Sequence, residues 1–198
     1  MSIDIVEETS SRLAEYAQVR TGLLVSELFD EENVVALAHG VAAEPSAVPT
    51  PYWKDYDSYP GGQPTDWSAR FDVSGWIILA AFCDAERVGG AVVIVDDPRI
   101  ELLRDCSSCA LLWDIRVAPE MRGQGIGSVL LRAAEDRARH RGASTLRVET
   151  QQVNVPACRF YQHEGFYLER ATPGAYADLP NEIQLLWRKS LTLAAPSG

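Results

Sequence analysis

The chain has 198 residues, 46% of them hydrophobic, which is enough to bury one sizeable core, so we expect a single domain over residues 1–198. Its formal net charge of −10 argues against binding to nucleic acid or to an anionic membrane surface. The amino end, MSIDIVEE, lacks the apolar core of a signal peptide, and the longest apolar run, 76–83, is too short to span a bilayer, so we expect a cytoplasmic protein.

The first 66 residues combine two short regular elements with a long irregular segment. Ser10 to Val19 has the spacing of an amphipathic helix, and Gly22 to Leu28 is compatible with a strand. Residues 39–63 are rich in Pro, Gly and aromatic residues without a period, which predicts a long loop, or a loop with one short helix. Because several large aromatic side chains between 52 and 59 argue against disorder, we interpret this loop as a substrate-side lid.

Residues 67–142 predict strands followed by a strand, a turn and a helix. The runs 76–82 and 88–95 are apolar and rich in β-formers, and the short turn between them predicts an antiparallel hairpin. A further apolar, β-branched run ends at Val117 and is followed by a Pro-containing turn. Apolar residues then recur at three- and four-residue spacing up to Gly142, which predicts an amphipathic helix.

Three glycines stand between this turn and the helix, in the sequence RGQGIG at 122–127. Glycines let backbone N–H groups converge on one point, and a helix amino end adds partial positive charge, so the loop suits a diphosphate. Arg122 adds a cation. Ser128 stands where a Rossmann fingerprint needs its last Gly, and no Lys follows Gly127 as a P-loop requires. An ordinary glycine-rich turn is the alternative that this loop alone leaves open.

A strand and a helix follow in residues 143–190, before the last strands. Residues 145–150 alternate apolar with polar side chains, so Glu149 lies on a polar face. Pro156 suits the first turn of a helix that Asn154 or Val155 caps.

Two of these passages resemble the GNAT superfamily of N-acetyltransferases. The glycine loop matches its acetyl-CoA pattern, [RQ]-x-x-G-x-[GA], at Arg122, Gly125 and Gly127. The later helix matches the pattern N-x-x-A-x-x-x-Y-x-x-x-G-F at Asn154, Ala157, Tyr161, Gly165 and Phe166. The resemblance implies an α/β (α+β) fold with a central mixed, mostly antiparallel twisted sheet flanked by helices, and acetyl-CoA bound where two central strands splay apart.

Short segments also resemble the streptothricin acetyltransferases, GNAT enzymes that acetylate an amine on the β-lysine moiety of an antibiotic. These segments are 51–56, 149–151 with 154–158, and Asn181-Glu182. The resemblance implies acetyl transfer from acetyl-CoA to a primary amine of a small cationic molecule, with a streptothricin-type antibiotic as the narrower expectation. A GNAT enzyme acting on a protein or peptide amine, and a non-catalytic acyl-CoA binding module, stay open as alternatives.

The chemistry of the transfer requires a group that takes a proton from the acceptor. An amine with a pKa near ~10.4 must lose a proton before it attacks, at a cost of roughly 4 kcal/mol near pH 7. The candidate bases are Glu149 and Asp114, on the strands expected to flank the cofactor, with Glu182 and Asp55 as outer candidates. Glu149 comes first because it faces away from its apolar neighbours. A solvated position, or an ion pair with Arg147 or Arg116, is the alternative.

The resemblance assigns the remaining roles. It places Tyr161 where its phenol can protonate the leaving CoA thiolate, with simple packing as the alternative, and a backbone N–H at Val117 or nearby where it can hold the oxyanion. The expected cofactor contacts are Ile115, Val117, Arg122, Gly123, Gln124, Gly125, Ile126, Gly127, Ser128, Asn154 and Ala157. Rings and carboxylates suit a cationic acceptor. The residues expected to contact the acceptor are Tyr52, Asp55, Tyr56 and Glu182, with Asp57 as a further carboxylate of the lid.

The cysteines and the expected partners complete the predictions. Cys106-Ser-Ser-Cys109 is a C-x-x-C without a second pair or a βαβ opening, so we expect no metal and interpret the cysteines as small buried or loop residues. The expected partner is a small-molecule amine, with no nucleic acid and no membrane. Dimers are the commonest homo-oligomers, so a homodimer is the assembly to test first.

Overall fold

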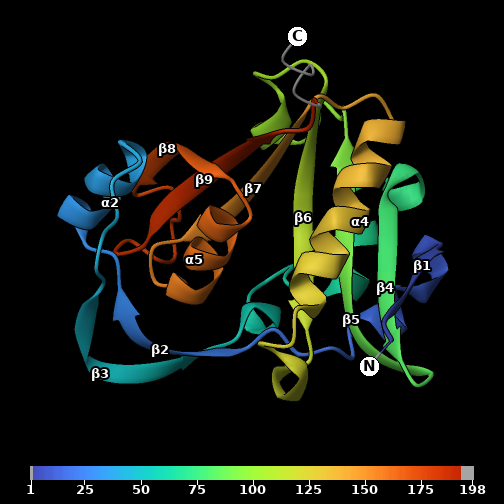
Figure 1. Cartoon of the computed structure of the whole chain (residues 1–198), viewed down its shortest axis with the longest axis horizontal. Helices are drawn as coiled ribbons and strands as arrows, with labels where there is room; N and C mark the ends of the chain where they lie inside the picture. The colour runs from blue at the N-terminus through green and yellow to red at the C-terminus, as the bar shows by residue number, and fades with distance from the viewer. Residues whose placement is uncertain (1, 193–198) are drawn as a thin grey trace, which may run out of the picture. The chain divides into compact units, whose positions relative to one another are not determined.

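The computed structural model describes residues 2–192 and divides into two compact units, each assembled from segments far apart in sequence (Figure 1). Among the described residues, unit 1 comprises 2–22, 55–146 and 190–192, and unit 2 comprises 23–54 and 147–189. The expectation of one domain over 1–198 stays a prediction.

The strands of residues 2–192 form a mixed sheet of seven strands in the order β1-β4-β5-β6-β7-β9-β8, and a separate pair, β2-β3. Their bounds are β1 Asp4–Glu8, β2 Leu23–Leu28, β3 Ser46–Lys54, β4 Ile77–Cys83, β5 Glu86–Val95, β6 Cys109–Val117, β7 Thr145–Gln151, β8 Tyr167–Pro173 and β9 Ile183–Ser190. The pairs β1-β4, β4-β5, β5-β6 and β8-β9 are antiparallel. The predicted mixed, mostly antiparallel sheet flanked by helices is confirmed.

The helices are short except for α4, which packs on β4, β5 and β6 in unit 1 (Figure 1). Their bounds are α1 Leu13–Tyr16, α2 Glu31–Ala38, α3 Trp67–Arg70, α4 Ile126–His140 and α5 Val155–His163. The apolar positions at three- and four-residue spacing in α4 are the ones that are buried, including Leu130, Ala134 and Ala138. The predicted hairpin 76–82/88–95, the strand to Val117, this helix and the strand 145–150 are all confirmed.

An aromatic cluster fills the unit 1 core beside the middle of β6. Val92 pairs with Asp114 and Val93 with Leu112, so Trp113 is the extra residue of a β-bulge. Its ring meets those of Trp67 and Trp76 at centroid distances of 6.1 and 5.3 Å. The bulge therefore directs the Trp113 side chain against the core. The polar residues Asp114 and Arg116 follow it in the same strand.

The predicted helix from Ser10 to Val19 is wrong in length. A 3-10 turn covers Ser10–Arg12 and α1 ends at Tyr16. The Tyr16 ring lies so close to β5 that a Cβ on Gly90 would overlap it. The Val19 carbonyl accepts a hydrogen bond from Arg116 at 3.0 Å. These tertiary contacts hold the chain away from a helical path, and helix periodicity alone does not report them.

The predicted loop over 39–63 is wrong for its middle part, because Ser46–Lys54 is strand β3, antiparallel to β2. The ladder is irregular: Glu27 pairs with Ala47 and Val25 with Tyr52, so the stretch 48–51 has no paired position. Pro49 and Pro51 lie in this stretch, where a missing N–H removes no ladder hydrogen bond. The prolines that suggested a loop are thus accommodated at a ladder irregularity.

The cysteine interpretation also needs a correction, because Cys106 and Cys109 form a disulfide. Their Cα atoms lie 5.7 Å apart, within the range that a disulfide spans, across a tight turn in which Ser108 has a φ of 57°. Cys158 is buried and Cys83 half-buried, as expected for small packing residues.

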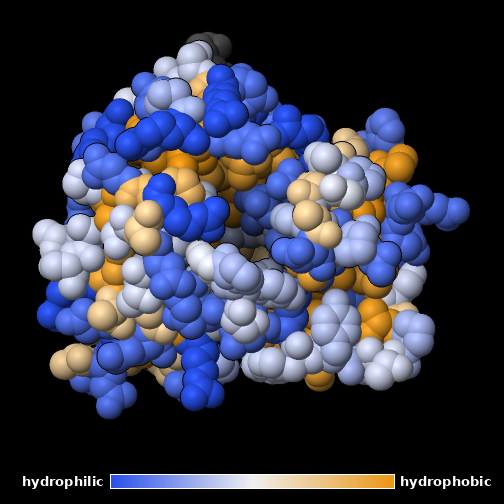
Figure 2. All heavy atoms as spheres, turned by 180° about the vertical axis from the view of Figure 1, so that it is seen from behind, coloured by the Kyte–Doolittle hydropathy of each residue, from blue (hydrophilic) through white to orange (hydrophobic). Residues whose placement is uncertain are grey.

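The face drawn in Figure 2 is mostly hydrophilic, and its hydrophobic residues appear as patches between polar side chains. Within residues 2–192 no helix combines the length and the apolar character needed to cross a bilayer. Cytoplasmic localisation stays a prediction.

Candidate active site

The glycine loop of unit 1 opens directly into α4 and leaves room beside the helix amino end. Gly123 and Gly125 have φ values of 76° and 81°, which side-chain-bearing residues rarely adopt. A Cβ at either position would meet no atom within 4 Å, so the space beside the loop is open. Gly125 is the N-cap and offers no side chain to the first turn, which carries no acidic residue. The loop therefore suits an anion, as predicted.

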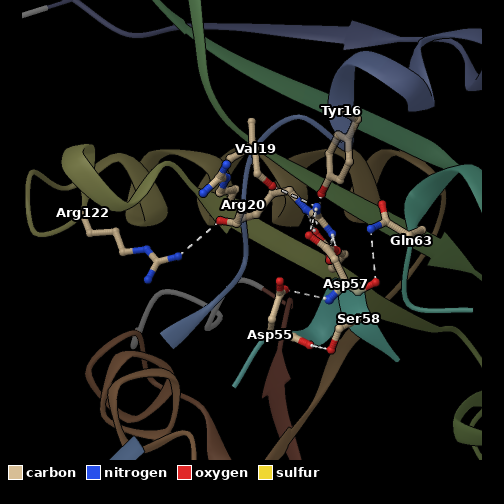
Figure 3. A network of polar contacts seen from close by, with 10 residues as sticks. Tyr16, Val19, Arg20, Asp55, Asp57, Ser58, Gln63 and Arg122 are labelled. Atoms are coloured by element: carbon tan, nitrogen blue, oxygen red, sulfur yellow. Dashed lines mark hydrogen bonds and ion pairs between the residues drawn. The ribbon is translucent and has the colours of Figure 1, made fainter. Parts of the chain in front are cut away.

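Arg122 is held by main-chain carbonyls. Its Nε donates to the Val117 carbonyl at 3.0 Å, its Nη1 to Gly22 at 3.0 Å and its Nη2 to Arg20 at 3.3 Å. In Figure 3 the side chain extends from the glycine loop toward Arg20. These bonds fasten the start of the loop to the end of β6 and to residues 20–22. A direct contact of Arg122 with the cofactor stays a prediction.

A buried charge cluster lies at the carboxyl end of β6, around Arg116, whose side chain is 1% exposed (Figure 3). Its Nε and Nη2 donate to the two oxygens of Asp114 at 2.9 and 2.8 Å, and its guanidinium also contacts Asp57 at 3.2 and 3.3 Å. Burial alone would lower the pKa of Arg116, but the carboxylate of Asp114, with Tyr16 and Asp57, raises it above its ordinary value. Arg116 is therefore always charged.

The two predicted bases of unit 1, Asp114 and Asp55, have hydrogen-bond partners in this cluster and in the neighbouring turn 56–58. Asp114 also accepts the Tyr16 hydroxyl at 2.6 Å, so both of its oxygens are engaged. Asp55 accepts from the Asp57 N–H at 3.1 Å and thereby caps the turn 56–58. Asp114 thus serves first as a counter-ion and Asp55 as a cap. Roles for either toward a substrate stay predictions.

Glu149 of unit 2 has a different environment, because neutral donors surround it. It accepts hydrogen bonds from the Tyr176 hydroxyl, from Gln151 Nε2 at 3.1 Å and from Gln184. Burial raises the pKa of its carboxyl group above the ordinary value, although these three hydrogen bonds oppose the shift. Arg147, the alternative partner, forms an ion pair with Glu169 at 2.7 and 2.8 Å. Of the predicted bases, Glu149 has the environment that best fits the role.

Helix α5 has the predicted cap. The Asn154 side chain accepts from the Ala157 N–H at 3.2 Å. Tyr161 is 3% exposed, and its ring packs edge-on against Phe160 and Phe166 at 5.2 and 5.3 Å. Packing is therefore part of its role, and proton donation to a thiolate stays a prediction.

Glu182 forms a buried ion pair with Lys54 within unit 2. Their Oε1 and Nζ atoms lie 2.6 Å apart, and the side chains are 9% and 1% exposed. Glu182 was predicted to contact the substrate, and this contact stays a prediction beside the observed structural one. Tyr52, two residues before Lys54 in strand β3, is exposed, and Tyr56 is half-buried.

Sequence reasoning missed Lys54, Gln151, Tyr176 and the Arg116 cluster. Lys54 and Gln151 lie within the segments that carry the narrower resemblance. Their polar side chains there could have indicated partners for Glu182 and Glu149. Tyr176 lies in an irregular segment between β8 and β9, outside every motif. Across residues 2–192 no three His, Cys, Asp or Glu side chains are grouped so that they could hold a metal ion.

Comparison with known proteins shows which family the chain resembles. The model of the acetyltransferase (GNAT) family matches residues 39–166. The streptothricin acetyltransferase of Escherichia coli is 30% identical over 190 residues, which cover 94% of this chain and 94% of that protein. Streptothricin acetyltransferase A of Bacillus subtilis (strain 168) is 34% identical over 91 residues, which cover 45% of this chain and 53% of the relative, about half its length.

Two solved structures share the fold, each with a TM-score of 0.73 and 21% identity. One is nourseothricin acetyltransferase, with 97% of this chain and 100% of that chain covered. The other is a Bacillus anthracis protein in complex with acetyl coenzyme A, with 96% and 99% covered. The chain therefore belongs to the acetyltransferase (GNAT) family, and the predicted fold, N-acetyltransferase class and acetyl-CoA co-substrate are confirmed at the level of that family.

Proposed function

We propose that this chain transfers the acetyl group of acetyl-CoA to a primary amine of a small cationic molecule, and that this molecule is a streptothricin-type antibiotic acetylated on its β-lysine amine. The substrate assignment is supported by the names of the Escherichia coli and Bacillus subtilis relatives, both streptothricin acetyltransferases. Homodimerisation is a separate proposal, and none of the contacts within residues 2–192 is used as an argument for it.

The observation that carries the acetyl-CoA part is the loop 122–127 at the amino end of α4. Its two left-handed glycines leave open space, and no side chain caps the first turn of the helix. The helix dipole and the converging N–H groups then favour the diphosphate of CoA. Acetyl-CoA supplies an activated thioester when bound, and this loop would hold its diphosphate.

Glu149 is the proposed general base. It takes a proton from the acceptor ammonium, and the nitrogen lone pair then attacks the thioester carbonyl carbon. The carbon–sulfur bond breaks and the acetyl group stays on nitrogen, while the leaving thiolate takes a proton from Tyr161. The nitrogen releases its second proton to become an amide, and this proton restores the Tyr161 phenol. Burial raises the pKa of Glu149, which brings its proton affinity closer to that of the amine and makes the transfer less unfavourable. The N–H at Val117 is proposed to stabilise the oxyanion.

The proposed acceptor contacts combine aromatic rings with acidic groups. Tyr52 and Tyr56 offer π faces to an ammonium group, and Asp55 and Glu182 offer negative charge. The formal net charge of −10 adds a long-range attraction for a cation.

A free-thiol release assay with acetyl-CoA tests the proposal across streptothricin, polyamines, aminoglycosides and peptides. We expect thiol release with streptothricin, and a product one acetyl group heavier by mass spectrometry. Release with peptides alone would favour the protein-amine alternative. Binding of acetyl-CoA without release for any amine would favour a non-catalytic acyl-CoA binding module.

A further inference from the structure

The Glu149 carboxylate accepts a hydrogen bond from a phenol in the β8-β9 connection. Tyr176 lies in the segment 174–182 and donates its hydroxyl proton to Glu149 Oε1. The two residues are 27 positions apart in the chain. The contact is therefore tertiary, and it depends on where the β8-β9 connection is placed.

Gln151 fixes the direction of this hydrogen bond. Its Nε2 donates to the Tyr176 hydroxyl oxygen at 3.1 Å and to Glu149 Oε1 at 3.1 Å. An amide nitrogen only donates, so the phenol oxygen accepts from Gln151 and its single proton is directed to Glu149. The three side chains close a ring in which Oε1 receives two hydrogen bonds.

The position of Tyr176 is set by its own segment. The Leu179 N–H donates to the Tyr176 carbonyl at 3.2 Å, and the Glu182 N–H donates to the Leu179 carbonyl at 3.0 Å. Glu182 is in turn anchored to Lys54 by the buried ion pair at 2.6 Å. A chain of contacts thus runs from Lys54 through this segment to the phenol on Glu149.

Burial raises the pKa of Glu149, and the hydrogen bond from Tyr176 is the largest of the three that oppose this effect. Tyr176, Gln151 and Gln184 hydrogen-bond the carboxylate, and all three are neutral. Arg147, the cation of the same strand, is committed to Glu169, which also contacts Arg188 from β9 at 3.7 Å. Oriented neutral donors therefore stabilise the ionised form of Glu149, while Arg147 and Arg188 contact Glu169.

We propose that Tyr176 is a positioning residue of acetyl transfer, which fixes the Glu149 carboxylate in one orientation and favours its ionised form through the phenol hydrogen bond. The inference rests on the proposed function, in which Glu149 is the base.

Tyr176→Phe removes the hydroxyl and keeps the ring. Loss of one hydrogen bond to a charged group corresponds to roughly a tenfold effect. We expect the acidic limb of the kcat/KM profile for the amine to move to higher pH by about one pH unit, with the acetyl-CoA KM unchanged. At pH values above the displaced limb, most of the lost rate should return, which a damaged fold would not allow. Glu149→Gln should abolish the limb and so assign it.

Tyr167→Phe is the matched control, because Tyr167 is exposed at the start of β8 and the substitution removes the same atom. It should leave the profile in place. A Tyr176→Phe profile that coincides with the wild type, while the amine is acetylated normally, overturns the inference and leaves the proposed function intact. If the wild-type enzyme acetylates no amine, the proposed function fails. Titration of Glu149 by carbon-13 NMR, assigned with Glu149→Gln, would then still decide whether Tyr176→Phe raises its pKa.

Discussion

Burial of the Glu149 carboxyl group has opposite consequences for its proposed role in catalysis and for stability. Burial raises the pKa of its carboxyl group in the folded protein. The unfolded chain exposes the group, so its pKa there returns to the ordinary value. The folded state is therefore favoured below the unfolded pKa, where the carboxyl is protonated, and this advantage is lost as pH rises through the folded pKa. Above the folded pKa, the ionised Glu149 carboxylate weakens the fold that holds it.

Glu149→Gln should separate these two effects. The variant keeps an acceptor oxygen for Tyr176 but removes the charge and the base. We expect turnover to fall by about 10²-fold or more, and the melting temperature at pH 7.5 to rise above that of the wild type. The difference in melting temperature should shrink as pH falls toward the ordinary Glu pKa. Thermal melts at several pH values and the thiol assay check this.

Glu86→Gln is the control, because Glu86 is exposed at the start of β5. It should change neither quantity. A Glu149→Gln variant that melts below the wild type at every pH would show that the charge stabilises the fold, contrary to this account.

Individual site residues were predictable where their role is local. Asn154 accepts from an N–H three residues away, and Gly125 caps its own helix, so spacing along the chain reveals both. Lys54 and Glu182 are 128 positions apart, and Tyr176 and Glu149 are 27 apart. No local pattern reports such pairs, since they exist only once distant segments are packed together.

Helix α4 has open glycines just before one end and just after the other, which allows a controlled test of the proposed cofactor binding by the glycine loop. Gly125 and Gly142 have φ values of 81° and 89°, and a Cβ at either would meet nothing within 4 Å. Gly125→Asp places negative charge at the amino end, where the diphosphate is expected, so acetyl-CoA affinity should fall at least tenfold by calorimetric titration. Gly142→Asp introduces the same strained residue beyond the carboxyl end and should leave the affinity unchanged.

Equal loss of affinity in the two variants would attribute the effect to backbone strain. Unchanged affinity in Gly125→Asp would remove the diphosphate from this loop.

The Arg116 cluster connects three segments of unit 1, namely residues 16–19, strand β6 and the turn 56–58. Arg116→Met would leave Asp114 and Asp57 without their buried cation, at a cost of about 3–5 kcal/mol in the free energy of unfolding. Asp57→Asn should cost less, because its contacts with Arg116 are the longer ones, at 3.2 and 3.3 Å against 2.8 and 2.9 Å for Asp114. Urea denaturation of both variants gives the comparison. Equal losses would mean that the cluster has no hierarchy.

The elements that sequence periodicity predicted correctly are those whose buried face repeats regularly, such as α4 and the hairpin β4-β5. Strand β3 was missed because it is exposed along almost its whole length, so no apolar alternation marks it. The disulfide was missed because C-x-x-C spacing is ambiguous until the turn geometry at Ser108 is known.

The whole molecule carries 28 acidic and 18 basic residues, so its two proposed substrates should respond oppositely to salt. A cationic acceptor is attracted by this charge, and anionic acetyl-CoA is repelled at long range. Added salt screens both interactions, with a Debye length of about 10 Å at 0.1 M. We expect the amine KM to rise and the acetyl-CoA KM to stay level or fall between low and high NaCl, measured by initial rates. An amine KM that is independent of salt would count against a cationic acceptor.

The sequence did not reveal which segments form each of the two units. Residues 23–54 pack with 147–189, and the whole segment between them, 55–146, belongs to the other unit. Hydropathy and spacing describe each segment alone, so they contain no information on which distant segments share a core.

The adjacent residues Lys54 and Asp55 belong to different units, and this limits how acceptor specificity can be transplanted. Lys54 depends on Glu182, and Asp57, just beyond Asp55, depends on Arg116. Grafting residues 52–59 from a relative without those partners would bury a cation or a carboxylate with no counter-charge. A chimera designed to change the proposed acceptor must therefore exchange three remote stretches at once. Natural drift in this enzyme should follow the same rule, with changes at 54 and 57 accompanied by changes at 182 and 116.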